Sequence, residues 1–323
     1  MRADPPSNKG EALHCDWCGS QEADFVLSGP DLLHDLPGEF TLVRCRTCGL
    51  FRQDPQLSWE ELEVYYPQDY AAFEPIIDTE PQLIRRFDRR YGMWKRLKAV
   101  ERIAPGRRLL DVGAGTGIFL AEAHRSGKWA LTGLEPHSEA ARYIREHLQI
   151  PVIEKRFDQA EIAPGSFDVI TMWNVLEHFD HPIAELRKAY RLLANGGLLV
   201  CSIPNLNSLE ARWFGPYWLG WDLPRHLYQF PLNSLEAILA ELGFVRVSMR
   251  CLATAHAALG LSILYALKAK DQHESGWGKV LLSLYDSKLA RLLLGPFLKI
   301  MDLLRLSSLI VVFAIKDESS RPS

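Results

Sequence analysis

The sequence predicts an α/β protein built on a doubly wound sheet, with a small cysteine-bearing module before the sheet and an apolar helical insertion near the end. Three observations predict this arrangement. From Arg107 onward, strand-like and helix-like segments alternate. Four of the six cysteines form two close pairs ahead of that region. A leucine-rich stretch covers roughly 252–306.

The alternating region predicts a seven-stranded sheet. Apolar strands are expected over 109–112, 130–134, from 152, over 167–173 and over 198–203, with helices over 118–126, 138–147 and 183–193 between them. A further helix over 235–242 ends at Gly243, and strands over 245–251 and 309–315 complete the sheet. Strands and helices at this spacing are typical of parallel sheets that helices cover on both faces.

The domain organisation follows from these patterns. A polar tail over 1–11 lacks the apolar run of a signal peptide, which favours a cytoplasmic protein. We expect a metal-binding module over 12–54, a helical connector and cap over 55–104, a core over 105–251 plus 307–317, and an insertion over 252–306. The connector includes a helix over 81–103 with one arginine-rich face.

Composition and charge are those of an ordinary globular protein. Hydrophobic residues make up 47% of the 323 residues and charged residues 24%, as in ordinary globular enzymes. The formal charge of −3 gives no global case for binding nucleic acid.

The insertion leaves two interpretations open. The apolar segment over 257–267 is too short for a membrane span, and the segment over 280–306 predicts an amphipathic helical pair broken at Gly295-Pro296. A helical cap on the core is one interpretation. Peripheral contact with the inner face of a membrane is the other, because the segment is long and rich in leucine.

The paired cysteines predict a metal site. Cys15 with Cys18, and Cys45 with Cys48, supply four thiolates, the closed tetrahedral set of a structural Zn²⁺, with iron as the alternative metal. A glycine follows each pair and eases the tight turn that aims backbone amides at sulfur. Because no coordination position stays open, we expect this zinc to hold structure and not to do chemistry.

A glycine-rich loop follows the first core strand. In Asp-Val-Gly-Ala-Gly-Thr-Gly (111–117), Gly113, Gly115 and Gly117 let the backbone approach a ligand at the start of a helix. The third glycine comes two residues after the second, which disfavours a nicotinamide dinucleotide. Asp111 would repel a pyrophosphate but suits the cationic end of a sulfonium amino acid.

Three further segments contribute candidate ligand-binding residues. Glu135, followed by Pro136, ends the second strand, where a carboxylate can accept hydrogen bonds from ribose hydroxyls. Phe157 and Asp158 follow the third strand, where an apolar wall and a polar contact could hold an adenine ring. Trp173 and Asn174 end the fourth strand, at the ligand-binding edge of the sheet.

Together these motifs resemble the class I S-adenosylmethionine (SAM)-dependent methyltransferases. The resemblance rests on segment 111–117, the acidic residue at 135, Phe-Asp-Val-Ile at 167–170, Leu-Glu-His at 176–178 and Gly-Gly-Leu-Leu at 196–199. The branch with the ubiquinone-pathway O-methyltransferases looks most similar. The resemblance implies a seven-stranded Rossmann-like core in which SAM lies against Asp111, Gly113, Gly115, Gly117, Glu135 and Asn174.

The N-terminal module carries a second resemblance. Cysteine knuckles ahead of such a core are similar to those of the nucleotide-sugar C-methyltransferases, which carry a small zinc domain there. The order of Tyr65, Tyr66 and Tyr70 also fits that group, in which aromatic residues cap the cofactor.

The acceptor side is expected at an aromatic segment over 218–230. There Arg225 could bind an anion and His226 could act as a general base, or the segment could be a packed loop with a hydrogen-bonded histidine. His178 is a second candidate base, or it caps the helix after the fourth strand.

The sequence therefore predicts a SAM-dependent methyltransferase acting on a small-molecule, sugar or lipid-linked acceptor at oxygen or carbon. Three alternatives stay open: an NAD(P)-dependent oxidoreductase, a non-catalytic zinc protein with a SAM fold, and a nucleic-acid methyltransferase that uses the zinc module and the basic helix. The acidic overall charge counts against the last.

Overall fold

The structure, a computed structural model, describes residues 14–67, 83–252, 255–270, 272–285 and 287–317. The tail expected over 1–11 and Tyr70 of the connector lie outside the described residues.

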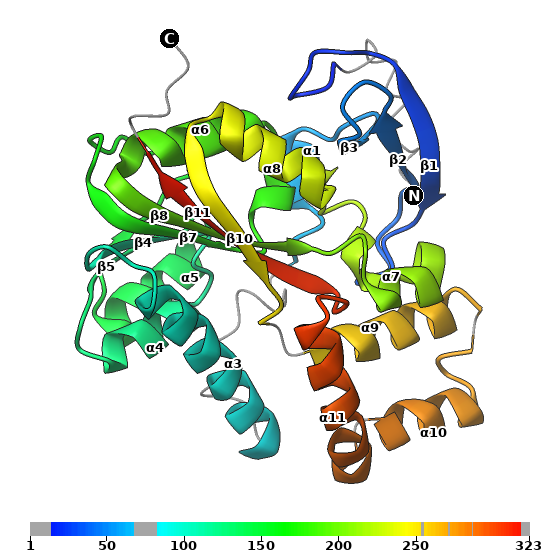
Figure 1. The fold of residues 1–323 in the computed structure, drawn as a ribbon. Coiled ribbons are helices and arrows are strands. Elements are labelled where there is room, and N and C mark those ends of the chain that lie inside the picture. The colour runs from blue at the N-terminus through cyan, green and yellow to red at the C-terminus, as the bar shows by residue number, and fades with distance from the viewer. Residues whose placement is uncertain (1–13, 68–82, 253–254, 271, 286, 318–323) are drawn as a thin grey trace.

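A seven-stranded sheet forms the centre of the molecule (Figure 1), and the prediction of a doubly wound α/β core is confirmed. Its strand order is β10-β11-β8-β7-β4-β5-β6. Strands β4 to β8 are parallel to one another, β11 is antiparallel to β8, and β10 is antiparallel to β11. The bounds are Arg108–Val112 (β4), Ala130–Leu134 (β5), Val152–Ile153 (β6), Phe167–Trp173 (β7), Leu193–Pro204 (β8), Phe244–Arg250 (β10) and Leu309–Lys316 (β11).

Helices cover both faces of this sheet. Because successive strand residues point to opposite faces, Leu109 and Leu110 of β4 belong to two separate hydrophobic cores. Leu109 packs with the helices α3 (Leu83–Glu101) and α4 (Ile118–Arg125) and with Ile144, which directly follows α5 (Ser138–Tyr143), whereas Leu110 packs with α6 (Pro182–Leu192) and α8 (Leu232–Glu241). This double burial explains why the parallel strands are apolar along most of their length.

The N-terminal module forms a second, antiparallel sheet that includes a strand from the core. Its order is β1-β2-β3-β9, with bounds Ala23–Gly29, Phe40–Cys45, Phe51–Gln53 and Tyr228–Gln229. Short strand-like stretches in the sequence at 25–27 and 40–43 predict β1 and β2, but no such pattern predicts β3 or β9. Strand β9 pairs with β3 directly after His226, so the module is joined to the predicted acceptor loop. The short helix α1 (Trp59–Glu63) follows, capped by Ser58 and Glu61.

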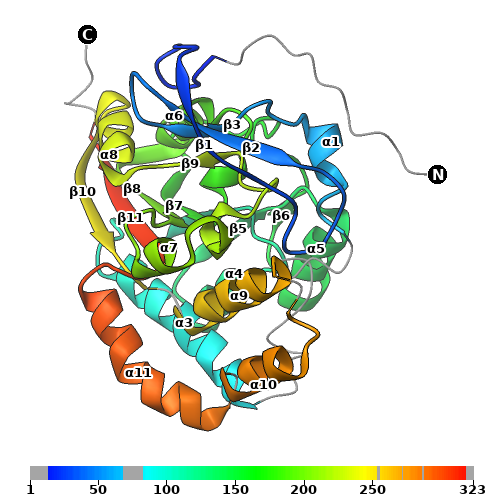
Figure 2. The same ribbon diagram turned by 90° about the vertical axis from the view of Figure 1, so that its right-hand side faces the viewer.

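A helical cap lies at one end of the central sheet (Figure 1). It contains α7 (Leu209–Phe214), α9 (Ala255–Lys268), α10 (Gly276–Tyr285) and α11 (Lys288–Leu303). The predicted break at Gly295-Pro296 is wrong, because α11 runs through both residues and its start is capped by Ser287 instead. Both residues are exposed, so solvent can hydrate the carbonyl group that Pro296 leaves without a donor. Figures 1 and 2 place α10 and α11 together at one end of the molecule, beside α3.

Candidate functional site

The candidate site lies at the carboxyl edge of the parallel strands. Chain order runs outward from β4 through β5 to β6, and then returns to β7 on the other side of β4. In open α/β sheets this change of direction leaves a crevice between the two loops that follow the central strands. The loops after β4 and β7 therefore meet at the ligand-binding edge.

The glycine loop after β4 has the conformation that its sequence predicts. Gly113, Gly115 and Gly117 have positive φ angles of 64°, 53° and 77°. A Cβ atom at Gly113 would lie 2.6 Å from a methyl group of Val175, in the loop after β7. Glycine is thus required both for the backbone turn and for the close approach of the two loops.

Asp111 lies beneath this loop, 2% exposed, and accepts a hydrogen bond of 2.5 Å from the hydroxyl of Thr171. Burial raises the pKa of Asp111 to about 7, although Thr171 and the positive charge of Arg96 oppose the rise. A cation bound at this edge would favour the ionised carboxylate. Asp111 is therefore placed to respond to a positively charged ligand.

Arg96 is a site residue that the sequence reasoning missed. Its guanidinium lies 4.9 Å from the ring centre of Trp173, and within the described residues its Nε has no hydrogen-bond partner. Burial lowers the pKa of Arg96 to about 10, so it stays charged at neutral pH. The spacing in the sequence could have identified it. Arg96 follows Met93 by three residues and precedes Val100 by four, so it lies on the inward face of α3 with them.

Glu135 directly follows β5, and its side chain connects the glycine loop after β4 with the start of α5. Its carboxylate accepts hydrogen bonds from the backbone N–H groups of Gly115 (2.7 Å) and His137 (2.9 Å), and it is 4% exposed. Burial raises its pKa. A carboxylate has about four lone-pair positions, so two remain for hydroxyl donors. Pro136, which follows, is exposed.

Two predicted residues at the end of β7 adopt defined positions. Trp173 packs between Arg96 and Phe119, whose ring centre lies 5.0 Å away. Asn174 has a φ of 55°, and its side-chain oxygen accepts a hydrogen bond of 2.6 Å from Ser202 on β8. That bond holds the loop after β7 against the neighbouring strand.

Two other predicted residues lie differently. Phe157 is buried in the core, with its ring centre 6.1 Å from that of Phe179. Asp158 is exposed and forms an ion pair of 3.1 Å with Arg156. Their assignment to an adenine pocket stays a prediction.

The two candidate bases lie together. The rings of His178 and His226 meet edge to face with centres 4.7 Å apart. The Nδ1 atoms of His178 and His226 lie 2.9 Å and 2.8 Å from the carbonyl oxygens of Arg225 and Gly220. A carbonyl only accepts, so Nδ1 carries the proton in each ring, and each Nε2 keeps a free lone pair.

Both imidazoles are neutral at pH 7. Burial, and then the neighbouring His226, lower the pKa of His178 to about 3. Burial also lowers the pKa of His226. The hydroxyl of Tyr66 lies 2.8 Å from Nδ1 of His178, so this connector residue belongs to the site, whereas the Tyr65 hydroxyl donates to the carbonyl of Pro37 in the N-terminal module.

Glu177 completes this cluster. It is fully buried, its Oε1 lies 3.9 Å from Nε2 of His226, and within the described residues neither carboxyl oxygen has a hydrogen-bond partner. Burial raises the pKa of Glu177 to about 8, so it is mainly protonated at neutral pH. Ligand atoms of Glu177, His178 and His226 lie within 4.8 Å of one another, so the cluster could also hold a divalent cation.

Arg225 does not have the role that the sequence suggests. Its guanidinium is fully buried and donates to Asp31 (2.7 Å), to Asp222 (2.7 and 3.1 Å) and to the carbonyl of Tyr65 (3.2 Å). These contacts use most of its donors, and two carboxylates already balance its charge. The expectation that Arg225 binds an external anion is therefore wrong; it fixes the loop that carries His226.

The four predicted zinc ligands converge. Sulfur atoms of Cys15 and Cys48 lie 3.4 Å apart, those of Cys18 and Cys45 lie 3.5 Å apart, and all four lie within 4.8 Å of one another. Tetrahedral zinc with bonds of about 2.3 Å requires sulfur separations of roughly 3.8 Å, so the cluster fits the metal. Although burial opposes it, N–H groups of Cys48 and Thr47 lower the pKa of Cys45 to about 6, whereas burial raises the pKa of Cys15 and of Cys48. A bound cation would favour the thiolate form of all four cysteines.

The comparisons with known proteins fall on the same region. A family model described as a methyltransferase domain matches residues 84–249, from α3 to β10. Ubiquinone biosynthesis O-methyltransferases from Pseudomonas aeruginosa and Pseudomonas putida are each 30% identical over 143 residues. The match covers 42% of this chain and 56% of each relative, so the chain spans about half the length of these relatives.

Solved structures with a similar fold are more distant. A SAM-dependent methyltransferase from Thermotoga maritima, described as a possible histamine N-methyltransferase, has a TM-score of 0.48 at 19% identity, covering 77% of this chain and all of that one. A putative sarcosine dimethylglycine methyltransferase from Galdieria sulphuraria has a TM-score of 0.48 at 15% identity, covering 80% and 97%.

Proposed function

Because the chain belongs to the methyltransferase domain family, we propose that it transfers a methyl group from SAM to a hydroxyl group of an acceptor molecule. The observation that carries the proposal is the loop between Asp111 and Gly117. Its glycines bring the backbone to the carboxyl edge of β4, between a buried aspartate and a glutamate that already contacts Gly115.

The residues at this edge match the chemical groups of SAM. Glu135 has lone pairs for ribose hydroxyls, and the open Nε of Arg96 suits the carboxylate of the methionine part. Asp111 favours the positive charge of that part, and the fit of these groups supports SAM over a dinucleotide. Bound SAM would supply an activated methyl group on a positively charged sulfur.

The histidine cluster supports a hydroxyl as the acceptor. Methyl transfer needs close alignment, and a hydroxyl must also lose its proton as the new C–O bond forms and the C–S bond breaks. The Nε2 atoms of His178 and His226 are unprotonated at neutral pH and are the candidates to take that proton. The matched relatives, named O-methyltransferases, agree with this choice.

We also propose that the four-cysteine cluster holds a structural Zn²⁺. With four thiolates there is no open position for a substrate, so the metal would stabilise the module and, through β3 and β9, the loop that carries His226.

The cofactor assignment is tested by calorimetric titration with SAM, S-adenosylhomocysteine and NAD⁺. We expect the first two to bind and NAD⁺ not to bind. Glu135→Gln should weaken SAM binding at least about tenfold, whereas Glu139→Gln, an exposed glutamate at the start of α5, should not. Binding of NAD⁺ without SAM would instead support an oxidoreductase.

The transfer step is tested with methyl-labelled SAM and a panel of phenolic, sugar and lipid-linked alcohols, with the product bond identified by mass spectrometry. His178→Gln or His226→Gln should lower kcat about 100-fold, and the exposed His124→Gln should not. A C-methylated product, or full turnover in both histidine variants, would contradict methyl transfer to a hydroxyl group with a histidine as the base. SAM binding without S-adenosylhomocysteine formation from any acceptor would favour a non-catalytic protein.

A further inference from the structure

One end of the molecule exposes an unusual number of large apolar side chains. On α11, Leu292 is 73% exposed, Ile300 55% and Leu303 75%. Together with their neighbours they recur every three or four residues and form one continuous stripe. The stripe consists of Leu289, Leu292, Leu293, Phe297, Ile300, Leu303 and Leu304.

The opposite side of α11 is also apolar, but it is buried. Leu298 and Met301 pack against Leu259 of α9 in a small core of their own. Since this inner side already attaches the helix to the protein, the outer stripe is not needed for folding. An apolar surface of this kind usually marks a binding surface.

Two more helices extend the apolar stripe. On α10, Trp277, Val280 and Leu284 are 53%, 57% and 62% exposed. On α3, the rings of Phe87, Tyr91 and Trp94 stack in sequence, with centres 6.2 Å and 5.7 Å apart, and each is at least 45% exposed. We call these two residue groups, together with the α11 stripe, the apolar end; Figures 1 and 2 show their helices at the same end of the molecule.

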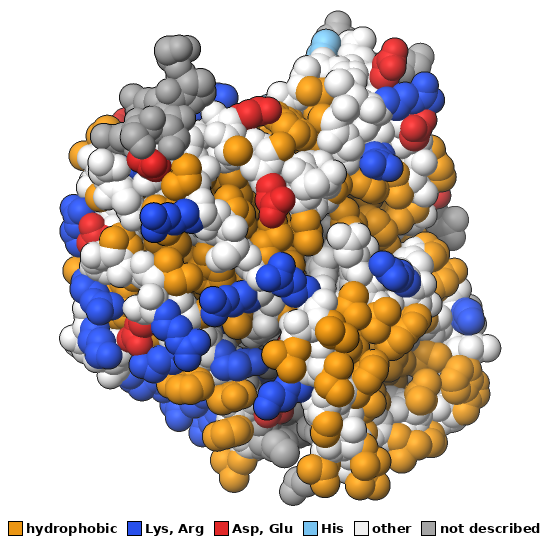
Figure 3. Space-filling view, in the orientation of Figure 1, with side chains coloured by type: hydrophobic (Ala, Val, Ile, Leu, Met, Phe, Trp, Pro, Cys, Tyr) orange, Lys and Arg blue, Asp and Glu red, His pale blue; other side chains and the backbone are white. Residues whose placement is uncertain are grey.

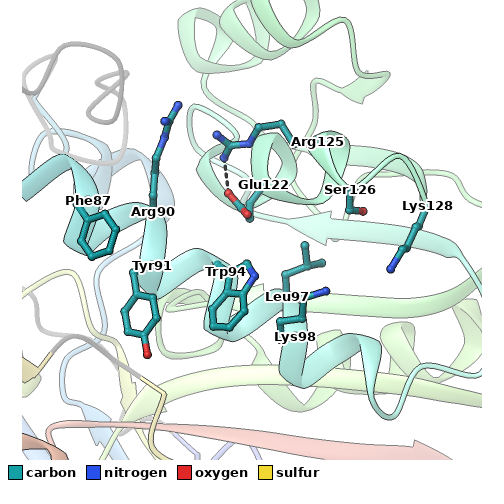
Figure 4. Close-up of a pocket in the computed structure, with 10 residues that line it drawn as sticks. All are labelled: Phe87, Arg90, Tyr91, Trp94, Leu97, Lys98, Glu122, Arg125, Ser126 and Lys128. Carbon is teal, nitrogen blue, oxygen red and sulfur yellow. Dashed lines mark hydrogen bonds and ion pairs between the residues drawn. The ribbon is translucent and has the colours of Figure 1, made fainter.

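A basic groove borders the apolar end. Between α3 and α4, the aromatic side chains of α3 line a groove with Arg90, Lys98, Arg125 and Lys128 (Figure 4). Glu122, in the lining, pairs with Arg125, and Glu101 pairs with both Lys98 and Lys128, so that among these described residues the positive charges outnumber the negative ones. Figure 3 shows Lys and Arg side chains gathered beside the hydrophobic surface, with few acidic side chains among them.

We propose that the apolar end docks onto the surface of a bilayer that contains anionic lipid, with α11 lying in the interface and the basic groove facing the headgroups. Aromatic and leucine side chains bordered by lysine and arginine are the features of helices that lie in a membrane interface. None of the helices in the described part of the chain could bridge a bilayer, since none combines enough length with enough apolar character. Docking is therefore peripheral.

Charge favours a bilayer over a second copy of the chain. In a twofold dimer formed through this end, each basic groove would approach its own copy, and like charges would repel. An anionic lipid surface instead attracts each lysine and arginine near it with about 1 kcal/mol.

The docking surface adjoins the acceptor side of the site. Helix α9, which carries α11, accepts a hydrogen bond of 3.0 Å at Ser262 from the backbone of Leu219, in the aromatic segment that leads to His226. Docking itself does not depend on catalysis. Its consequence, that a lipid-linked acceptor reaches His226 from the bilayer, rests on the proposed function.

The test is flotation of the full chain with two kinds of vesicle, phosphatidylcholine alone and phosphatidylcholine with 30% phosphatidylglycerol. We expect the protein to float with the anionic vesicles, and Leu292→Asp/Ile300→Asp to weaken this partition more than about tenfold. Phe25→Asp/Val64→Asp, at residues 68% and 65% exposed elsewhere, is the matched control and should bind normally. Arg90→Glu should weaken binding about fivefold or more, and the exposed Arg187→Glu on α6 should not.

These outcomes separate the proposal from its rivals without any turnover. Failure to bind either vesicle, or equal loss in the control and the α11 variant, overturns membrane docking. Sedimentation of the same proteins distinguishes self-association: a dimer that Leu292→Asp/Ile300→Asp dissociates, without vesicle binding, would assign this end to a second copy. Circular dichroism verifies that each variant is folded. SAM binding by a variant that no longer floats would show that docking and cofactor binding are separate properties.

Discussion

The guanidinium of Arg96 lies over the ring of Trp173, and its charge opposes the rise in the pKa of Asp111. Within the described residues its Nε has no hydrogen-bond partner. If it holds the methionine carboxylate of SAM, Arg96→Gln should raise KM for SAM about tenfold or more, since a charge-assisted hydrogen bond is lost. Arg102→Gln, at an exposed position just after the same helix, is the control for charge alone. Equal KM values in both variants would contradict the assignment.

The buried histidine predicts a pH dependence of stability. The folded pKa of His178 is about 3, against about 6.5 in an unfolded chain. Its contribution is therefore fully present above about pH 6.5, and falls by up to about 1.4 kcal/mol per pH unit below that value, because only the unfolded chain then takes up the proton. Urea denaturation at pH 7, 6 and 5 should show the wild type losing stability relative to His178→Gln.

The same experiment contains its own check. The pKa values of Glu177 and Asp111 are raised, so their contributions to the free energy of unfolding decrease as pH rises, opposite to that of His178. Both groups are present in the wild type and in His178→Gln, so their contributions cancel when the two proteins are compared. The exposed His124→Gln should keep a constant stability difference from wild type across this range. A constant difference for His178→Gln as well would mean that its pKa is ordinary.

Residues within one motif could be predicted from the sequence, and residues brought in from elsewhere could not. Asp111 lies near the end of β4, and the three glycines and Glu135 follow β4 and β5, so their place at the sheet edge comes with the strand pattern. Arg96 and Tyr66 reach the site through the packing of α3 and the connector. The exposure of Asp158 and the ion pairs of Arg225 depend on neighbours distant in sequence, Asp31 among them.

At the scale of elements, the loop after β4 depends on one close contact. Gly113→Ala should cost about 1–2 kcal/mol for the positive φ alone, and more because its Cβ would overlap Val175. Gly165→Ala is the matched control, since Gly165 has a φ of 71° and open space around it. Adding Val175→Ala to Gly113→Ala should recover the part of the free energy of unfolding that is lost through overlap, as measured by urea denaturation. If nothing is recovered, the whole loss comes from the strained backbone at position 113.

The cysteine cluster predicts metal dependence. Purified protein should contain one zinc per chain by elemental analysis, and Cys18→Ser/Cys45→Ser should abolish it. Tm should then fall by at least about 5 °C, as expected for a loss of ~2 kcal/mol or more in a protein of this size. Cys251→Ala, a buried cysteine outside the cluster, should keep its metal. Full stability without metal would refute a structural zinc.

The element pattern was predictable where periodicity and length agreed, as for β7, predicted and found over Phe167–Trp173. Strands β3 and β9 are too short to show alternation, and only their pairing makes them strands. In α11, Gly295-Pro296 was a false stop signal, because tertiary packing of Leu294 before it and of Leu298 and Met301 after it holds the helix on both sides.

At the scale of the whole molecule, the N-terminal module reaches the acceptor side through Gln53. Its side-chain amide, fully buried, donates a hydrogen bond of 2.7 Å to the carbonyl of Pro224, two residues before His226. Gln53→Ala should lower kcat about tenfold while SAM affinity changes less than twofold, because the loop moves but the glycine loop does not. Gln21→Ala, exposed in the same module, is the control. A larger effect on SAM affinity than on kcat would contradict this division.

The pairing of β3 with β9 also has a consequence for synthesis on the ribosome. Residues 14–53 emerge early and can bind their metal at once. The outer edge of β3 then stays unpaired until Tyr228 and Gln229 have been synthesised. A nascent chain stalled before Tyr228 would therefore carry a loaded module with an unpaired edge. Translation speed through the core should affect the yield of this protein more than that of a methyltransferase without such a module.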